Sequence, residues 1–116
     1  MLIHEFILVN KNEIPHDALA ENISYNLTKT RECVKVSDDI IVNNSDFLSS
    51  FKTHWSYTGN IHEGLDYHGI TIILNEDIKQ FVDVLAKYSD RNDVQKLDKL
   101  CRTALIQNKN IVHFGI

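Results

Sequence analysis

Five residues near the middle of the chain have side chains that could bind a metal ion or transfer a proton. They lie close together in the sequence: His54, His62, Glu63, Asp66 and His68. Imidazoles and carboxylates are the usual ligands and acid–base groups of such sites. Their spacing is irregular and matches no metal-binding motif. Three interpretations therefore stay open: solvated loop residues, a polar patch that recognises a protein partner, and a metal or acid–base site.

The motifs that mark common enzyme classes are missing from the sequence. It contains no phosphate-binding loop, dinucleotide fingerprint, nucleophile elbow, metalloprotease helix, paired Cys-x-x-Cys or EF-hand loop. The four glycines are spread over residues 59–115 and cannot form a phosphate-cradling loop. We therefore predict that the protein is not an enzyme, with no catalytic residues, no metal site and no cofactor.

Two histidines and two cysteines outside this cluster have simpler interpretations. His4 and His113 lie in apolar stretches typical of strands, where a lone histidine is usually a hydrogen-bonded core or sheet-face residue. Cys101 falls on the inner face of an amphipathic helix and should behave as a small hydrophobic residue. Cys33 has no identifiable histidine or aspartate partner. We expect both thiols to be reduced.

Length and composition indicate one globular domain over residues 1–116. Hydrophobic residues make up 43% of the chain and charged residues 24%, and one proline with four glycines leaves no room for a disordered linker. The formal net charge of −4 argues against nucleic acid as a direct ligand. The sequence shows no signal peptide and no apolar run long enough for a membrane span, so we expect a cytoplasmic protein without membrane contact.

The order of secondary-structure elements follows from hydrophobic periodicity and turn residues. We expect a strand at 2–9, a helix at 15–28, and an alternating segment at 31–43 that bends at 37–39 as a hairpin or long bent strand. A short helix capped by Ser45 should present Phe47, Leu48, Phe51 and Trp55 on one face, and an exposed loop should span 56–64. A strand at 65–74 and helices at 76–88 and 93–107, the first capped by Asn75, precede a terminal strand at 111–116.

This order predicts an α+β fold. It is a single domain with a partly antiparallel sheet, helices packed mainly on one face, and a terminal β-strand. The final apolar residues, Ile111-Val112-His113-Phe114-Gly115-Ile116, should be tied into the sheet, because a frayed end would leave large side chains in water.

Residues 65–116 resemble a known family. The strand Asp66-Tyr67-His68-Gly69-Ile70-Thr71-Ile72-Ile73, the helix motif Leu97-x-x-Leu100-Cys101-x-x-Ala104 and the terminal strand are similar to those of small bacterial immunity proteins of contact-dependent growth-inhibition systems. Such proteins bind and neutralise the C-terminal toxin domain of a partner adhesin, often a nuclease. The resemblance implies a protein inhibitor that binds its toxin one-to-one and blocks the active site or substrate groove.

A contact surface can be assigned from exposed polar and aromatic residues. Carboxylates can face a basic toxin surface, and tyrosine is common among interface anchors. Ordinary turn and cap chemistry is the competing interpretation of each carboxylate. The partner-binding residues that we predict are Asp38, Asp39, Tyr57, His62, Glu63, Asp66, Tyr67 and His68.

Two alternative functions remain. One is a small protein-binding adaptor of phage or plasmid origin, which would be encoded beside a gene that is not a toxin. The other is a metal-dependent enzyme that uses residues 54–68, which would copurify with a metal or turn over a substrate.

Overall fold

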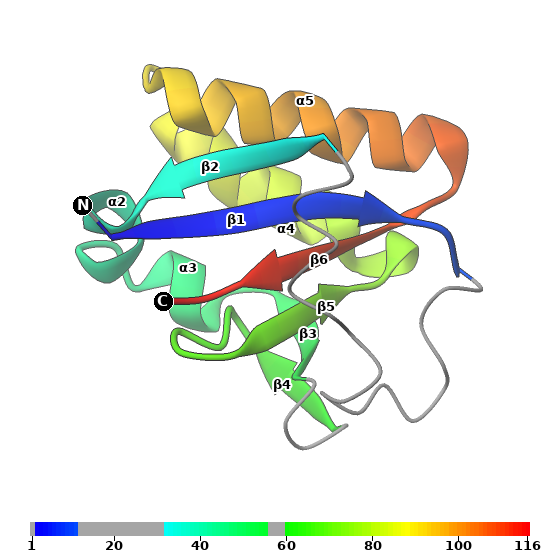
Figure 1. Cartoon of the computed structure of the whole chain (residues 1–116), viewed down its shortest axis with the longest axis horizontal. Helices are drawn as coiled ribbons and strands as arrows, with labels where there is room; N and C mark the ends of the chain where they lie inside the picture. Colours follow the sequence, from blue (N-terminus) through cyan, green and yellow to red (C-terminus); the bar gives the residue numbers. More distant parts are fainter. Residues whose placement is uncertain (1, 12–31, 56–59) are drawn as a thin grey trace.

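The computed structural model describes residues 2–11, 32–55 and 60–116, and the following statements concern these residues. The sheet that they form has six strands, all paired antiparallel. The strands are β1 (Ile3–Val9), β2 (Cys33–Ser37), β3 (Lys52–Trp55), β4 (Ile61–Glu63), β5 (Ile70–Ile73) and β6 (Asn110–Phe114). Their order in the sheet is β2-β1-β6-β5-β3-β4 (Figure 1). The α+β prediction is confirmed.

The predicted terminal strand lies inside the sheet. β6 pairs with β1 on one side and with β5 on the other. All five of its residues, Asn110 to Phe114, are buried. β6 therefore joins two smaller sets of strands, β2-β1 and β5-β3-β4, into one sheet.

Two helices cover one face of this sheet. They are α4 (Ile78–Leu85), flanked by the 3-10 turns η3 (Asn75–Asp77) and η4 (Ala86–Tyr88), and α5 (Asn92–Gln107). Both are amphipathic, and their apolar stripes pack on alternate residues of the strands in one core, as predicted. The largest side chains with no exposed surface in this core include Phe6, Phe47, Phe81 and Leu97.

The opposite face of the central strands is also apolar and buried. Its side chains come from the other parity of β1, β5 and β6, and they are Ile7, Val9, Ile72, Val112 and Phe114. The sequence of a strand that is buried on both faces is a nearly continuous run of apolar residues. This accounts for the composition of residues 111–114, whereas Gly115 and Ile116 lie beyond the strand and are partly buried.

The segment after β2 is a helix where the sequence predicted a hairpin or bent strand. Asp38–Val42 form α2, and Ser37 stands at its N-cap position. Asp38 and Asp39 occupy the first turn, where carboxylates stabilise the positive end of the helix dipole. Consecutive Ile40 and Ile41 are both buried, which a half-buried strand does not permit.

Three further predictions were wrong in part. The predicted helix face from Phe47 to Trp55 is divided, because α3 (Asp46–Ser49) ends early and residues 52–55 form β3. Residues 65–69 are a loop, so the predicted strand at 65–74 is confirmed only for Ile70–Ile73. The predicted loop at 56–64 contains β4 at residues 61–63, and the predicted helix at 15–28 lies outside the described residues.

Asn75 caps a different helix from the one expected. Its side-chain amide donates to the carbonyl oxygens of Ala104 at 3.0 Å and Lys109 at 2.8 Å, so it satisfies the end of α5. Asn108 ends that helix in the left-handed conformation with φ 56°. The side chain of Asn110 in turn accepts from the Asn75 backbone N–H at 2.8 Å.

The central place of β6 predicts a large effect of truncating its side chains. Phe114 is 2% exposed, and Phe114→Ala should lower the free energy of unfolding by about 3–5 kcal/mol, through lost burial and a residual cavity. Urea denaturation followed by circular dichroism measures this loss. Ile106→Ala is the matched control, because Ile106 is 85% exposed. Equal stability of the two variants would contradict the assignment of β6 to the core.

Candidate functional site

The predicted contact residues occupy three places in the fold. Asp38 and Asp39 begin α2, and His62 and Glu63 lie in the edge strand β4. The loop between β4 and β5 carries Asp66, Tyr67 and His68. Tyr57 lies outside the described residues.

The start of α2 and the β4–β5 loop meet at one end of the sheet. The Tyr67 hydroxyl donates to Asp38 Oδ2 at 2.8 Å, and the Tyr67 and His68 rings contact edge-to-face with centroids 4.8 Å apart. His68 is exposed beside them. We call Asp38, Asp66, Tyr67 and His68 the polar end surface. Sequence could not show that residues 38 and 67 are neighbours.

The loop that carries this surface is held by its backbone. The N–H groups of Gly64 and Leu65 donate to the carbonyl oxygens of Phe51 at 2.7 Å and Phe47 at 2.9 Å. The N–H of Asp66 donates to Thr71 Oγ1 at 2.8 Å. Gly64 has φ 75°, and a Cβ there would lie 2.0 Å from the backbone of Leu48, so only glycine fits.

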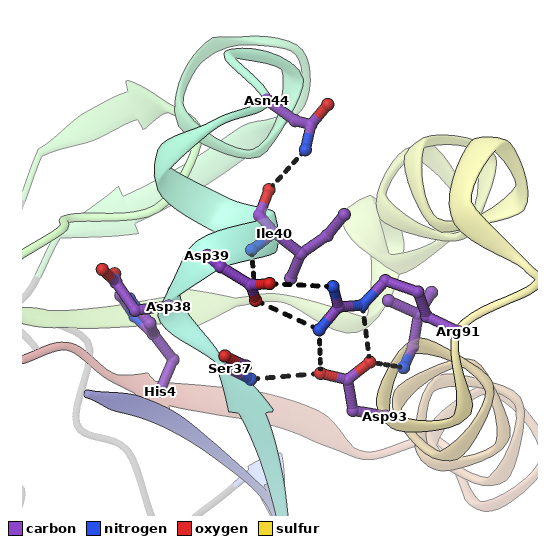
Figure 2. Close-up of polar contacts among 9 residues, drawn as sticks. His4, Ser37, Asp38, Asp39, Ile40, Asn44, Arg91 and Asp93 are labelled. Carbon is purple, nitrogen blue, oxygen red and sulfur yellow. Dashed lines mark hydrogen bonds and ion pairs between the residues drawn. The ribbon is translucent and has the colours of Figure 1, made fainter. Parts of the chain in front are cut away.

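Asp39 points away from Asp38, toward the start of α5. Its two carboxylate oxygens accept from Arg91 at 3.1 Å each, and Arg91 also contacts Asp93 at 3.0 Å (Figure 2). Hydrogen bonds from Arg91 lower the pKa of Asp39. The Asp39 side chain is 59% exposed, so it is accessible as predicted, but its charge is already paired.

Asp38 is not the exposed turn residue that the sequence indicated. Its side chain is 15% exposed, and Oδ1 lies 2.9 Å from Nε2 of the buried His4. Burial alone would raise the pKa of Asp38, but the hydrogen bonds from His4 and Tyr67 outweigh burial and lower that pKa. Its contact with a partner stays a prediction.

Behind Asp38 a chain of polar side chains crosses the sheet inside the core. His4 Nδ1 lies 2.8 Å from His113 Nε2, and His113 Nδ1 lies 3.1 Å from Thr71 Oγ1. His4, His113 and Thr71 have no exposed surface. We call Asp38, His4, His113 and Thr71 the buried histidine chain. The interpretation of both histidines as satisfied core residues is confirmed, although sequence gave no sign that they contact each other.

The hydrogens of this chain can be assigned with both imidazoles neutral. The Thr71 hydroxyl then donates to His113, His113 Nε2–H donates to His4, and His4 Nε2–H donates to Asp38. Burial, and secondly the nearby His4, hold the pKa of His113 well below its ordinary value. An aspartate, a histidine and a hydroxyl in series are also the parts of a nucleophilic triad. Here the Thr71 hydroxyl is buried where no substrate reaches it, so the buried histidine chain stabilises the fold.

The other histidines of the central cluster do not converge. In the β3–β4 register Thr53 faces His62 and His54 faces Ile61, so His54 and His62 point to opposite sides of the sheet. Within residues 2–11, 32–55 and 60–116, no group of three or more His, Cys, Asp or Glu side chains could hold a metal ion.

His62 instead belongs to a groove at the β4 edge. Its ring stacks on Trp55 with centroids 4.0 Å apart and planes 7° from parallel, and Trp55 Nε1–H donates to the Gly64 carbonyl at 2.9 Å. Beside the ring lies a groove of about 500 Å³, which Lys52, Ile61 and Glu63 also line. Two of the predicted contact residues therefore flank a depression that a partner side chain could enter.

Both cysteines are free thiols. Burial raises the pKa of Cys101 far above its ordinary value. Burial, followed by a hydrogen bond to Glu5, raises the pKa of Cys33 to about 11. Neither sulfur is in the thiolate form that a nucleophile needs at neutral pH.

Comparisons of the chain with protein-family models, curated proteins and solved structures found no match. Among the described helices none has the length and apolar character needed to cross a membrane.

The neutral state of His113 predicts a specific loss of stability in mild acid. The unfolded chain protonates this residue as the pH falls through about 6.5, while the folded chain keeps it neutral. The contribution of His113 is therefore complete above pH 6.5 and decreases below it, at a limiting slope of about 1.4 kcal/mol per pH unit for one proton. The carboxylate of Asp38 acts in a separate window, below about pH 4.

Urea denaturation between pH 7.5 and pH 5 measures this slope. His113→Asn should reduce the slope by one proton, whereas His68→Asn, at an exposed position, should leave it unchanged. Ring ¹³C chemical shifts should report a neutral His113 in the folded protein at pH 5. A protonated His113 ring at that pH in the folded state would contradict the assignment.

Proposed function

We propose that this chain is a cytoplasmic immunity protein that binds one cognate toxin domain, a nuclease, and blocks its active site or substrate groove. The observation that carries the proposal is the hydrogen bond between Tyr67 and Asp38, which joins two separately predicted contact segments into one surface. The resemblance of residues 65–116 to immunity proteins of contact-dependent growth-inhibition systems supplies the partner class.

The rigidity of this surface supports an inhibitor. The backbone bonds of Gly64, Leu65 and Asp66 hold the β4–β5 loop before any partner arrives. A preformed loop loses less conformational entropy on binding, so more of the contact energy appears as affinity. Tyr67 and His68 present aromatic rings at the rim of this loop, and tyrosine is enriched among residues that dominate binding energy.

Charge also favours a basic target. The chain carries a formal net charge of −4. Nucleases bind phosphate through basic residues, and carboxylates can occupy the same groove. Glu63 and Asp66 have no ion pair with any described residue, in contrast to Asp39, which is paired with Arg91. These two carboxylates are therefore the ones we expect to face the toxin.

A charge-reversal experiment tests the proposal. The probe is the purified C-terminal domain encoded by the gene immediately upstream, which the proposal requires to be a toxin domain of a secreted protein. The double variant Glu63→Lys/Asp66→Lys should slow association with this domain at least tenfold, because electrostatic steering is lost, and should weaken protection of toxin-expressing cells. The affinity of the unmodified chain should also fall as salt rises from 50 to 300 mM.

The matched control is Asp83→Lys/Asp90→Lys, which makes the same charge change at two exposed aspartates outside both the polar end surface and the β4 groove that contains Glu63. It should retain most of the association rate, and both variants should melt within a few degrees of the parent. Full protection by Glu63→Lys/Asp66→Lys would remove both the polar end surface and the groove at the β4 edge from the proposal. Failure of the unmodified chain to bind or to protect would reject the immunity function itself.

A further inference from the structure

A groove at the other edge of the sheet lies between β2 and α5. It has a volume of about 670 Å³ and is lined by residues 32–35 and by Lys96, Lys99, Leu100 and Thr103. The four α5 residues share the i, i+3, i+4, i+7 spacing of a single helix stripe. β2 is the outermost strand on this side, and α5 runs beside it (Figure 1).

The backbone of β2 has hydrogen-bonding groups that point into this groove. The Asp38 N–H donates inward to Leu2 at 3.0 Å, whereas the Ser37 N–H donates outward to Asp93 of α5 at 3.1 Å. Because amide direction alternates along a strand, Lys35 and Cys33 also direct their N–H groups outward. Asp93 closes the Ser37 end of this edge, and no described residue pairs with the outward backbone groups of Lys35 and Cys33.

The groove is basic, although the chain as a whole is acidic. Lys35, Lys96 and Lys99 have no ion pair with any described residue, while Glu32 is the one carboxylate of the lining. Lys35 stands opposite Glu5 in the strand register and so lies on the sheet face away from the helices. Lys96 and Lys99 lie on α5, on the other side of the strand edge. A strand added beside β2 would have lysines on both of its faces.

We propose that this groove binds an extended acidic segment of another protein, which adds to β2 as a seventh strand of the described sheet. The outward backbone groups of Lys35 and Cys33 pair with the segment's main chain, as in other cases where peptides join a sheet edge beside a helix. Val34 and Leu100, 8% and 4% exposed, supply an apolar contact between the lysines. A second copy of this chain is disfavoured, because like-charged edges repel.

This site goes beyond the proposed function and does not depend on it. It lies at the edge formed by β2, whereas the groove at His62 and Glu63 lies at the opposite edge formed by β4. None of the residues that line it belongs to the polar end surface. Binding of an acidic segment here and binding of a basic toxin at the polar end surface can therefore be measured separately on the same protein.

The first experiment uses a fluorescein-labelled peptide of alternating glutamate and valine, seven residues long, with the full chain. Anisotropy should show saturable binding that weakens several-fold between 50 and 300 mM salt. In ¹⁵N spectra the Cys33 and Lys35 amides should shift and exchange more slowly with solvent, while the inward amides of Val34 and Val36 should keep their existing protection. A peptide with lysine in place of glutamate should not bind.

Two further comparisons separate strand addition from nonspecific charge attraction. Lys96→Glu/Lys99→Glu should lower peptide affinity at least tenfold, whereas Lys79→Glu/Lys109→Glu, with the same charge change outside the groove lining, should lower it less than threefold. N-methylation of alternate peptide amides blocks the hydrogen bonds of one edge of the added strand. The peptide methylated on the edge that faces β2 should not bind, whereas the peptide methylated on the opposite edge should bind.

Several outcomes would overturn the proposal. They are equal binding by both N-methylated peptides, equal affinity of the two lysine variants, and amide shifts confined to residues outside β2 and α5. If a single-stranded heptanucleotide binds more tightly than the acidic peptide, the ligand of the groove is nucleic acid and not a protein segment. A dimer of the free chain that Lys96→Glu/Lys99→Glu dissociates would assign the groove to a second copy.

Discussion

The buried histidine chain is the constraint on which the arrangement of the sheet depends. It crosses three neighbouring strands and the start of α2 through hydrogen bonds in series, and both nitrogens of each imidazole are used. A buried polar group without a partner costs roughly 1–3 kcal/mol. Displacing β6 relative to β1 by one residue would separate His113 from His4 and leave one buried nitrogen of each ring without this partner. The buried histidine chain therefore specifies strand register more sharply than the surrounding apolar side chains can.

The buried histidine chain also links the core to the surface. Asp38 accepts one hydrogen bond from the buried His4 and another from Tyr67, so one carboxylate positions a core imidazole and a surface phenol. Asp66 is tied to the other end, because its backbone N–H donates to Thr71. The polar end surface thus takes its geometry from the interior of the sheet. A substitution at Asp38 changes stability and surface shape together, which makes it a poor probe of binding alone.

Local patterns predicted the elements that carry strong periodicity. The apolar stripe of α5, the end of that helix at residue 107 and the apolar run of β6 could all be predicted from the sequence. Residues 38–42 were misassigned because Ile40 and Val42 continue the alternation of β2, while the evidence for a helix, two adjacent buried isoleucines, appears only in three dimensions. The contact between His4 and His113 joins residues 109 positions apart. Local sequence patterns do not predict contacts between residues this far apart, and for the same reason they do not predict the contact between Asp38 and Tyr67.

The place of β6 between β1 and β5 has a consequence during synthesis. β6 follows the other five described strands in the chain, yet it is the element that connects β2-β1 with β5-β3-β4. Until the ribosome has released this segment, the inner edges of β1 and β5 have no strand between them, and the apolar side of α5 lacks Ile111. Long-range pairing of this kind is slow and leaves strand edges open to other chains. During synthesis the two sets of strands, β2-β1 and β5-β3-β4, must therefore avoid pairing with other protein chains until β6 inserts between β1 and β5.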